Sequence, residues 1–246
     1  MAIGIETDRD PREASGILGR VGEELDAAGP EPRDVGVQVL GGETDPLPAR
    51  AAPARGFTRA GAFLHAFGAD MSSAWGLAVN SREHIVVADC AGRCVHICQV
   101  DGTLLHTIKP FDYLDESVGT YEVHFLCPEY VAVNSKDEII VSDIDLNCMK
   151  VFNSEGAFVG RLGAGGKREG QFYVPCGVCV DEEDNIYCAD YNNRRVQFLS
   201  AGAGELSRVL LCGVRAPQAV AVRRGKLVVV HRGDISVYQL PPVDLM

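Results

Sequence analysis

Apolar and polar positions along most of this chain form short runs of four or five residues, each bounded by Asn, Asp or Gly. The clearest unit is an apolar run, a polar turn, a second apolar run and then a closing residue. It occurs four times and closes at Asp89, Asp143, Asp190 and His231, which are 54, 47 and 41 residues apart. Short runs rich in β-branched residues and bounded by turn formers predict strands joined by hairpins, not helical repeats.

Each copy continues with a third apolar run, and three copies add a fourth. The third runs are VHICQV, MKVFNS, RVQFLS and ISVYQL, and the fourth are TLLHTI, AFVGRL and ELSRVL. Four antiparallel strands per repeat are the blade of a β-propeller. The first strands carry a small residue where they would crowd around the axis, at Ala78, Ala132, Cys179 and Ala221. The predicted fold class is therefore all-β: a β-propeller of four-stranded antiparallel blades, four of them legible.

One stretch is specific enough to suggest a family. The sequence GAGGKREGQFYVPCGVCV at 163–180 precedes a D-x-x-N-x-R-V-x-F pattern that starts at Asp190. It resembles an NHL repeat, the blade unit of NHL-type β-propellers, and this family normally has six blades. The copy closing at Asp143 fits with one extra residue in its turn, which puts Met149 where the pattern has Arg. The resemblance covers residues 57–240.

The polar residues of this pattern have a structural explanation. An Asp at the end of a second strand can accept hydrogen bonds from backbone N–H groups of the next turn, and an Arg five residues later can return to it. We therefore predict turn clamps in place of a catalytic pair. The predicted clamp residues are Asp89, Asp143, Asn147, Asp190, Asn193 and Arg195.

The chain divides into two predicted parts. Residues 1–55 are rich in Ala, Gly, Pro and charge, with strand alternation only in VGVQVL, so we expect a disordered leader or linker; a divergent pair of blades is the alternative. Residues 56–246 form the predicted propeller. Its first segment, 56–68, aligns with a third and a fourth strand. Residues 62–67 could complete the last blade and close the ring, and a truncated six-bladed propeller is the alternative.

Charge and hydropathy limit the partners. The net charge is −11; residues 57–160 hold 14 acidic and 6 basic side chains, whereas residues 161–246 hold 9 acidic and 11 basic ones. This acidity argues against a general polyanion binder, so DNA is not an expected partner and RNA is disfavoured. No apolar run is long enough to span a membrane, and the first 20 residues lack a signal-peptide pattern. We predict a cytoplasmic protein without membrane contact.

The number and spacing of the cysteines raise the question of a metal site. Nine cysteines, an odd number, fit a reducing compartment. Cys176 and Cys179 form a C-x-x-C, and Cys90, Cys94 and Cys98 lie four residues apart, so zinc has to be considered. Residues three apart on a strand point to opposite faces, which is poor geometry for a shared metal. We expect buried thiols that act as small apolar residues, with no metal and no cofactor.

The expected binding surface is one rim of the propeller. If strands alternate in direction, turns between second and third strands share this rim with the linkers between blades. The longest linker, 109–126, interleaves aromatic and acidic side chains as protein-contact hot spots do, whereas Lys167, Arg168, Arg194 and Arg215 make another part basic. The predicted partner-binding residues are Phe111, Tyr113, Asp115, Glu116, Tyr121, Lys167, Arg168, Tyr191, Asn192, Arg194 and Arg232. An ordinary loop and a solvated basic surface are the respective alternatives.

The sequence predicts a binding module that is not an enzyme. No GxSxG, HExxH or P-loop pattern occurs, and the six histidines do not share equivalent first-strand positions. The resemblance implies a propeller like the one at the end of tripartite-motif (TRIM-NHL) ubiquitin ligases, which captures a protein or RNA target. This chain shows no RING domain, so a role in ubiquitin-ligase substrate recognition follows from the resemblance alone. A protein partner is expected; the alternatives are an RNA-binding propeller in post-transcriptional control and a propeller lyase or hydrolase.

Overall fold

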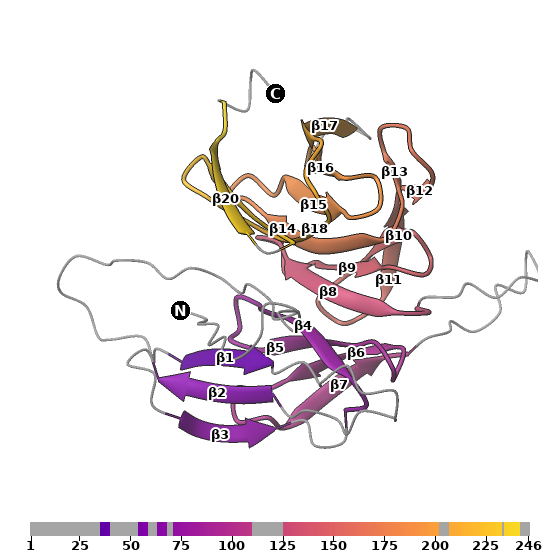
Figure 1. Ribbon diagram of the computed structural model, residues 1–246. Helices are drawn as coiled ribbons and strands as arrows, with labels where there is room; N and C mark the ends of the chain where they lie inside the picture. The colour runs from indigo at the N-terminus through magenta and orange to yellow at the C-terminus, as the bar shows by residue number, and fades with distance from the viewer. Residues whose placement is uncertain are drawn as a thin grey trace, which may run out of the picture.

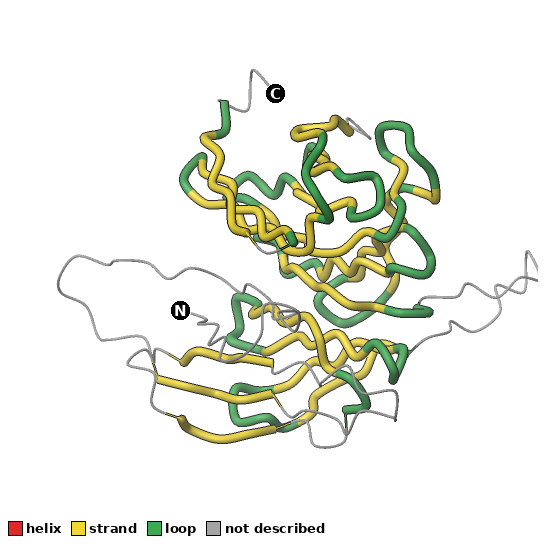
Figure 2. The backbone as a smooth tube through the Cα atoms, viewed as in Figure 1, coloured by secondary structure: helices red, strands yellow, loops and turns green. Residues whose placement is uncertain are grey.

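The computed structural model describes residues 35–39, 54–58, 63–67, 71–109, 125–201, 207–232 and 234–241. Strands joined by turns and bends make up these residues, and no helix occurs among them (Figure 2). This described part of the chain accordingly contains no helix that could cross a membrane. The predicted all-β class is confirmed.

The four predicted repeats are four antiparallel sheets that follow one another in chain order (Figure 1). Their first strands lie side by side, with β8 between β4 and β14, and β14 between β8 and β18. The first sheet holds β4 (Ala74–Val79), β5 (Ile85–Asp89), β6 (Cys94–Cys98) and β7 (Leu104–Ile108), and the second holds β8 (Pro128–Val133), β9 (Ile139–Asp143), β10 (Cys148–Phe152) and β11 (Phe158–Leu162). The third holds β14 (Pro175–Val180), β15 (Ile186–Asp190), β16 (Arg195–Leu199) and β17 (Ser207–Cys212), and the last holds β18 (Pro217–Arg223), β19 (Lys226–His231) and β20 (Asp234–Gln239). These sheets are the blades that the repeats predicted.

Two smaller sheets complete the described strands. A short parallel pair, β12 (Ala164–Gly165) and β13 (Gln171–Phe172), lies in the linker before β14. Before the repeats, β1 (Val35–Val39), β2 (Ala54–Thr58) and β3 (Phe63–Phe67) form an antiparallel sheet, and β1 lies against β4. β2 and β3 are the two strands expected near 56–68.

This first sheet bears on two expectations. β1 is a strand inside the segment predicted to be a leader, but most of residues 1–55 lies outside the described residues, so that prediction stays a prediction. β3 pairs with β2, in a sheet separate from that of β20. Closure of the last blade by residues 62–67 is therefore not the arrangement of the described strands.

The first strands pack so closely that two positions require glycine. A Cβ at Gly76 would lie 2.5 Å from the backbone oxygen of Glu129, and one at Gly177 would lie 2.5 Å from Cα of Ala219. Protein interiors are close-packed, so neither position accepts a side chain unless the backbone moves. In these two sheets a close approach thus lies two residues before the small residues Ala78 and Cys179 that the sequence pointed to.

Candidate functional site

The rim that carries the turns between second and third strands is organised by buried carboxylates, of which Asp190 at the end of β15 is held mainly by side chains. Its side chain is fully buried and accepts hydrogen bonds from the backbone N–H of Tyr173 (2.8 Å), from Asn193 Nδ2 (2.8 Å), from Arg195 Nε (2.7 Å) and from Gln197 Nε2 (3.0 Å). Four donors satisfy the buried charge, and charge-assisted bonds of this kind are strong.

Arg195 is committed to structure as well. Its Nη1 donates to the carbonyl oxygen of Lys167 at 2.8 Å, and its Nη2 donates to those of Arg168 and Gln171 at 2.7 Å. The guanidinium therefore holds the linker before β14 as well as the turn after β15. With four of its five N–H donors in use and its side chain buried, Arg195 is a structural residue.

Asp89 and Asp143 hold the same place in the two preceding sheets. Each accepts backbone N–H groups from the linker before its own sheet and from the turn after its strand. The donors are Ser72, Ser73 and Gly92 for Asp89, and Leu126, Cys127, Asp145 and Leu146 for Asp143. Sequence reasoning expected only the bonds from the following turn. The bonds from the linker, 16 or 17 residues earlier, show that each Asp fixes both chain segments that reach the rim.

The three turns have equal length. In each, the Asp pairs with the residue five positions later, which is Cys94, Cys148 or Arg195. The extra residue that the sequence analysis placed in the Asp143 turn therefore does not exist. Cys148 stands where Arg195 stands, so the assignment of Met149 to this position is wrong.

The residue before each third strand has an unusual backbone. Arg93, Asn147 and Arg194 occupy this equivalent position, with φ of 52°, 52° and 56°. The left-handed region suits Asn better than most other residues with a side chain, because the short amide bonds locally. Arg194 is exposed on a turn whose backbone conformation does not favour arginine.

Two positions meet wherever neighbouring sheets adjoin at this rim. One is the residue after the Asp: Cys90, Ile144 and Tyr191 each donate a backbone N–H to a carbonyl just before the first strand of their own sheet. The other is the residue directly before the first strand of the next sheet. The facing pairs are Cys90 with Cys127, Ile144 with Val174, and Tyr191 with Ala216. We call these contacts the disulfide seam, the apolar seam and the arginine seam.

The disulfide seam is covalently closed by the bond between Cys90 and Cys127. The expectation of a buried free thiol is thus wrong for Cys90. The carboxyl of Glu129 lies within 4.8 Å of both sulfur atoms. Burial, together with the nearby charges of Asp145 and Asp143, raises the pKa of Glu129 to about 7. This seam is closed, and its surroundings are acidic.

The apolar seam carries two aliphatic side chains. Ile144 and Val174 both lie against the larger apolar cluster of the molecule. The backbone N–H of Val174 donates to Asn147 Oδ1 at 2.8 Å, so the left-handed turn residue of one sheet holds the start of the next.

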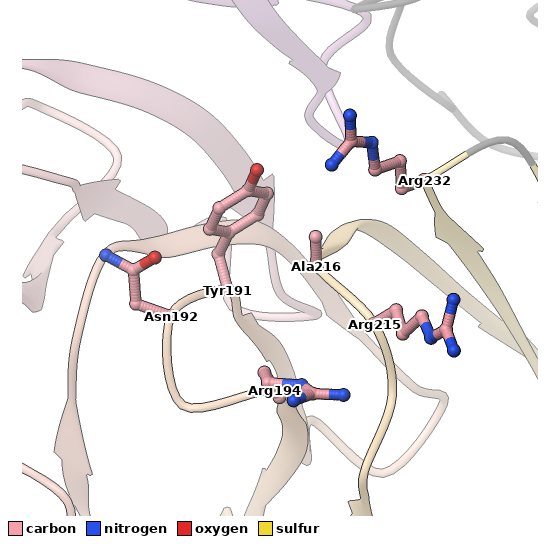
Figure 3. Close-up of a pocket in the computed structure, with 6 residues that line it drawn as sticks. All are labelled: Tyr191, Asn192, Arg194, Arg215, Ala216 and Arg232. Carbon is pink, nitrogen blue, oxygen red and sulfur yellow. The ribbon is translucent and has the colours of Figure 1, made fainter.

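The arginine seam is open. A hollow of about 590 Å³ is lined by Tyr191, Asn192 and Arg194 from the turn between β15 and β16, by Arg215 and Ala216 from the linker before β18, and by Arg232 from the turn after β19 (Figure 3). Figure 3 shows these side chains arranged around Ala216. The small methyl group of Ala216, in the place of Cys127 and Val174, leaves the space.

Three of the described residues that line the hollow are positively charged. Arg194, Arg215 and Arg232 are exposed, and within the described ranges no carboxylate forms an ion pair with any of them. Arg195, one residue from Arg194, is by contrast buried against Asp190. An open cavity with three arginines, one tyrosine and one asparagine is suited to an anionic ligand, since guanidinium groups bind carboxylates and phosphates through two parallel hydrogen bonds.

On the opposite rim, two of the three junctions between sheets share one arrangement. Ser81 donates its backbone N–H and its hydroxyl to Asp137 at 2.8 and 2.6 Å, and Ser135 donates the same two groups to Asp184 at 2.7 and 2.6 Å. The same staple thus joins consecutive sheets twice. At the third junction the backbone N–H of Arg224 instead donates to Glu182 Oε1 at 3.5 Å, so this rim varies as well. The rim with the arginine seam is the candidate site because it carries the open hollow.

The structure places the predicted partner-binding residues in three groups. Tyr191, Asn192, Arg194 and Arg232 come together in the hollow. Lys167 and Arg168 are exposed on the linker before β14, and their carbonyl groups hold Arg195. Outside the described residues lie Phe111, Tyr113, Asp115, Glu116 and Tyr121. Sequence reasoning missed Ala216, whose position directly before the first-strand Pro217 was the available signal.

Comparison with known proteins gives two curated relatives. No protein-family model matches this chain. The chain is 30% identical over 155 residues to "Probable peptidyl-alpha-hydroxyglycine alpha-amidating lyase pgal-1" of Caenorhabditis elegans, covering 61% of this chain and 43% of that protein. It is 29% identical over 116 residues to "Protein brain tumor" of Drosophila melanogaster, covering 46% of this chain and 11% of that protein. The chain therefore spans less than half the length of either relative.

Solved structures agree on the fold. A chain in a crystal structure of a nidogen/laminin complex superposes with a TM-score of 0.62 at 15% identity, over 77% of this chain and 72% of that one. At this identity the likeness shows the fold alone. The strand pattern, the sheets and the two curated relatives together confirm that this chain is a β-propeller that resembles the NHL-repeat propellers.

Proposed function

We propose that this chain is a non-catalytic binding module that holds an acidic segment of a partner protein in the arginine seam. The observation that carries the proposal is the open hollow with three arginines that form no ion pair with a carboxylate of the described residues. Arg and Tyr are the residue types that dominate protein-contact hot spots. A carboxylate or phosphate group that enters between Arg194, Arg215 and Arg232 gains charge-assisted hydrogen bonds at small structural cost.

The charge distribution supports a short anionic segment over a long polyanion. The chain carries a net charge of −11, and the sheets before the arginine seam hold most of the acidic excess. A long nucleic acid that extends from the hollow would meet this acidic surface, whereas a peptide with a few carboxylates or one phosphate would not. RNA is the second candidate, because Tyr191 beside three arginines also suits a stacked base and its phosphates.

A lyase activity is the third candidate, since one curated relative is named a lyase. The residues of this chain favour binding over catalysis. The histidines with described side chains are His84 before β5, His96 on β6, His106 on β7 and His231 on β19, and thus none of these four lies on a first strand. They do not converge on the propeller axis, where a shared catalytic metal would need them.

The proposed cellular setting rests on resemblance. TRIM-NHL-like ubiquitin ligases use such a propeller to recognise substrates, so we infer an adaptor that presents its partner to a ligase. The aromatic and acidic linker at 109–126 is the second predicted contact of this adaptor. A pull-down with and without residues 111–122 tests that linker separately from the arginine seam.

The direct test is fluorescence polarisation with three labelled probes: a Glu-rich peptide, the same peptide with a phosphoserine, and a single-stranded RNA of equal charge. We expect the peptides to bind and the RNA to bind more weakly than about 1 µM at physiological salt. Arg215→Glu and Arg232→Glu should each weaken peptide binding at least about tenfold. Lys136→Glu, which makes the same charge change at an exposed position of the other rim, should not.

The outcomes separate the candidates. The RNA-binding hypothesis would be supported if the chain binds RNA more tightly than peptide and loses this binding in the double variant Arg194→Glu with Arg168→Glu. Equal losses for Lys136→Glu and Arg215→Glu would show a general charge effect and no site. Release of glyoxylate from a peptidyl-α-hydroxyglycine would make the chain an enzyme.

A further inference from the structure

Three metal-binding side chains converge in the sheet β4–β7, away from the arginine seam. Cys94 and His96 lie two residues apart on β6 and therefore point to the same face of the strand. Asp89, at the end of β5, pairs directly with Cys94. Cys94 Sγ lies 3.3 Å from His96 Nε2, which lies 3.6 Å from Asp89 Oδ2, and the three donor atoms all lie within 4.8 Å of one another.

These separations match the edges of a tetrahedral zinc site. Zinc binds thiolate sulfur at about 2.3 Å, and imidazole nitrogen and carboxylate oxygen at about 2.0–2.2 Å. A tetrahedron with these bonds has donor-to-donor edges of roughly 3.3–3.6 Å. The observed sulfur-to-nitrogen and nitrogen-to-oxygen distances match two of these edges, and the third pair, Cys94 Sγ and Asp89 Oδ2, lies within 4.8 Å.

The surroundings orient the donors. His96 Nδ1 lies 3.0 Å from Thr107 Oγ1 on β7, so a hydrogen bond to this hydroxyl leaves Nε2 free to ligate. Such a partner on the second nitrogen is usual for metal-binding histidines. The Asp89 carboxylate is held by the backbone N–H groups of Ser72 and Ser73 at 2.7 Å. Asp89 and Cys94 are buried, whereas His96 is only partly so, and a water can approach from that side.

Comparison of the blades gives an independent reason for a cation here. The positions of Asp89, Cys94 and His96 correspond to Asp190, Arg195 and Gln197 in the third repeat. In that repeat the Arg195 guanidinium neutralises the buried carboxylate at 2.7 Å. In the sheet β4–β7 the Cys94 thiol replaces the guanidinium, and His96 Nε2, 3.6 Å from Asp89 Oδ2, is the group that either carries a proton or binds a cation beside the buried carboxylate.

We propose that Asp89, Cys94 and His96 form a structural binding site for a divalent zinc-like metal ion that replaces the Arg195 guanidinium in this blade. Cys94 binds as the thiolate and His96 as the neutral imidazole, so one ion displaces the protons that these groups carry. A water fills the fourth position. The neighbouring Cys90 and Cys127 are bonded to each other and take no part. The proposal is independent of the arginine seam and of the proposed function.

The test uses the full chain, stripped with a chelator and titrated with Zn²⁺ by calorimetry, and with Co²⁺ by absorption, which reports a thiolate–cobalt bond directly. We expect one ion per chain. Cys94→Ser and His96→Gln should each weaken binding more than about 100-fold, beyond the usual effect of losing an outer partner. The matched control is Cys212→Ser, which removes an exposed free thiol outside the cluster.

One further variant separates a metal site from an ion pair between protonated His96 and Asp89. His96→Arg keeps a cation opposite Asp89 but removes the imidazole ligand. We expect it to fold, to resist chelator and to lose the cobalt–thiolate absorption. The proposal is wrong if the wild-type chain shows no cobalt–thiolate absorption, or if Cys94→Ser binds Zn²⁺ as the wild type does. Loss of binding in Cys212→Ser alone would mean that the exposed thiol is the metal ligand.

Discussion

The disulfide seam and the arginine seam occupy the same two backbone positions and differ in almost every chemical respect. Cys90 and Cys127 join their sheets by a covalent bond, whereas Tyr191 and Ala216 leave a hollow between theirs. The backbone hydrogen bond that positions Cys90 recurs at Tyr191, at 3.0 and 3.1 Å. The repeat therefore supplies a standard frame, and the side chains placed on it decide whether a seam is a joint or a binding site.

Their charges differ in the same direction. Glu129 lies beside the two cysteines, with Asp143 and Asp145 close enough to raise its pKa, whereas three arginines line the other hollow. Within one rim, an anion is therefore repelled at one end and attracted at the other. Such a gradient orients an acidic ligand before it makes contact.

The largest expected effect comes from removal of the buried clamp of the arginine seam. Asp190→Ala leaves the Arg195 guanidinium buried without its carboxylate, and loss of one partner of a buried pair typically costs about 3–5 kcal/mol. Urea denaturation should show this loss of unfolding free energy. Arg194→Ala, four residues away on the same turn but exposed, should leave the denaturation curve unchanged. The opposite result would reverse our division into structural and functional residues.

The covalent bond of the disulfide seam should rank next. The double variant Cys90→Ala with Cys127→Ala removes a cross-link between residues 37 apart, for which about 2–4 kcal/mol is typical. Thermal unfolding of the wild type with and without reductant should show a matching difference. Peptide binding at the arginine seam should not change, because that seam has its own clamp. If reduction alters binding but not stability, the two seams are coupled and the comparison between them fails.

Substitution of the glycines where first strands meet should reduce stability similarly at the two seams. Gly76→Ala beside the disulfide seam and Gly177→Ala beside the arginine seam both place a methyl group against the backbone of the next first strand. Overpacking of this kind costs about 1–3 kcal/mol. Gly160→Ala on β11 is the control, since no atom lies within 4 Å of the added Cβ. Equal stability of Gly160→Ala and Gly177→Ala would mean that the first strands are not closely packed.

Most of the fold was predictable because the sequence pattern of a blade occurs four times in the chain. Alternating short strands, polar turns and an Asp after the second strand specify a blade locally, and each copy corroborates the others. The turn around Asp143 shows the limit. Asn147 can be aligned either with Asn193 or with Arg194, and only the strand register, with Asp143 opposite Cys148, decides between them.

The site was predictable only in part, since it depends on contacts between repeats. The rim followed from strand direction, and four of its predicted residues meet in the hollow. The pairing of Cys90 with Cys127 did not follow, because the two lie in different repeats and are separated by the longest linker. The cluster of Asp89, Cys94 and His96 was missed for a related reason. The spacing of cysteines drew attention, while the C-x-H pair that shares one strand face did not.

A pH titration should show the acidic character of the disulfide seam. The pKa of Glu129 is raised to about 7 in the folded protein, so the folded state binds more protons than the unfolded state between about pH 4.5 and pH 7. Stability from this group therefore falls as pH rises through that window. Glu129→Gln should match the wild type at pH 4 and exceed it by roughly 1 kcal/mol at pH 8, after allowance for solvent screening. A difference that is independent of pH would assign the effect to packing.

The smallest expected change in stability tests whether one seam can be converted into another. In the apolar seam, Asn147 Oδ1 accepts the backbone N–H of Val174, and the corresponding residues of the arginine seam are Arg194 and Ala216. Arg194→Asn places a residue that tolerates positive φ at this turn and offers Ala216 the same acceptor. We expect unfolding free energy to rise by about 0.5–1.5 kcal/mol, the net value of one hydrogen bond. Acidic-peptide binding should fall at the same time, because one of the three arginines is lost and the hollow is bridged. Denaturation and fluorescence polarisation on the same sample test both expectations. A more stable variant that binds the peptide as the wild type does would show that Arg194 is not part of the site. A less stable variant would show that the two seams do not share a backbone frame.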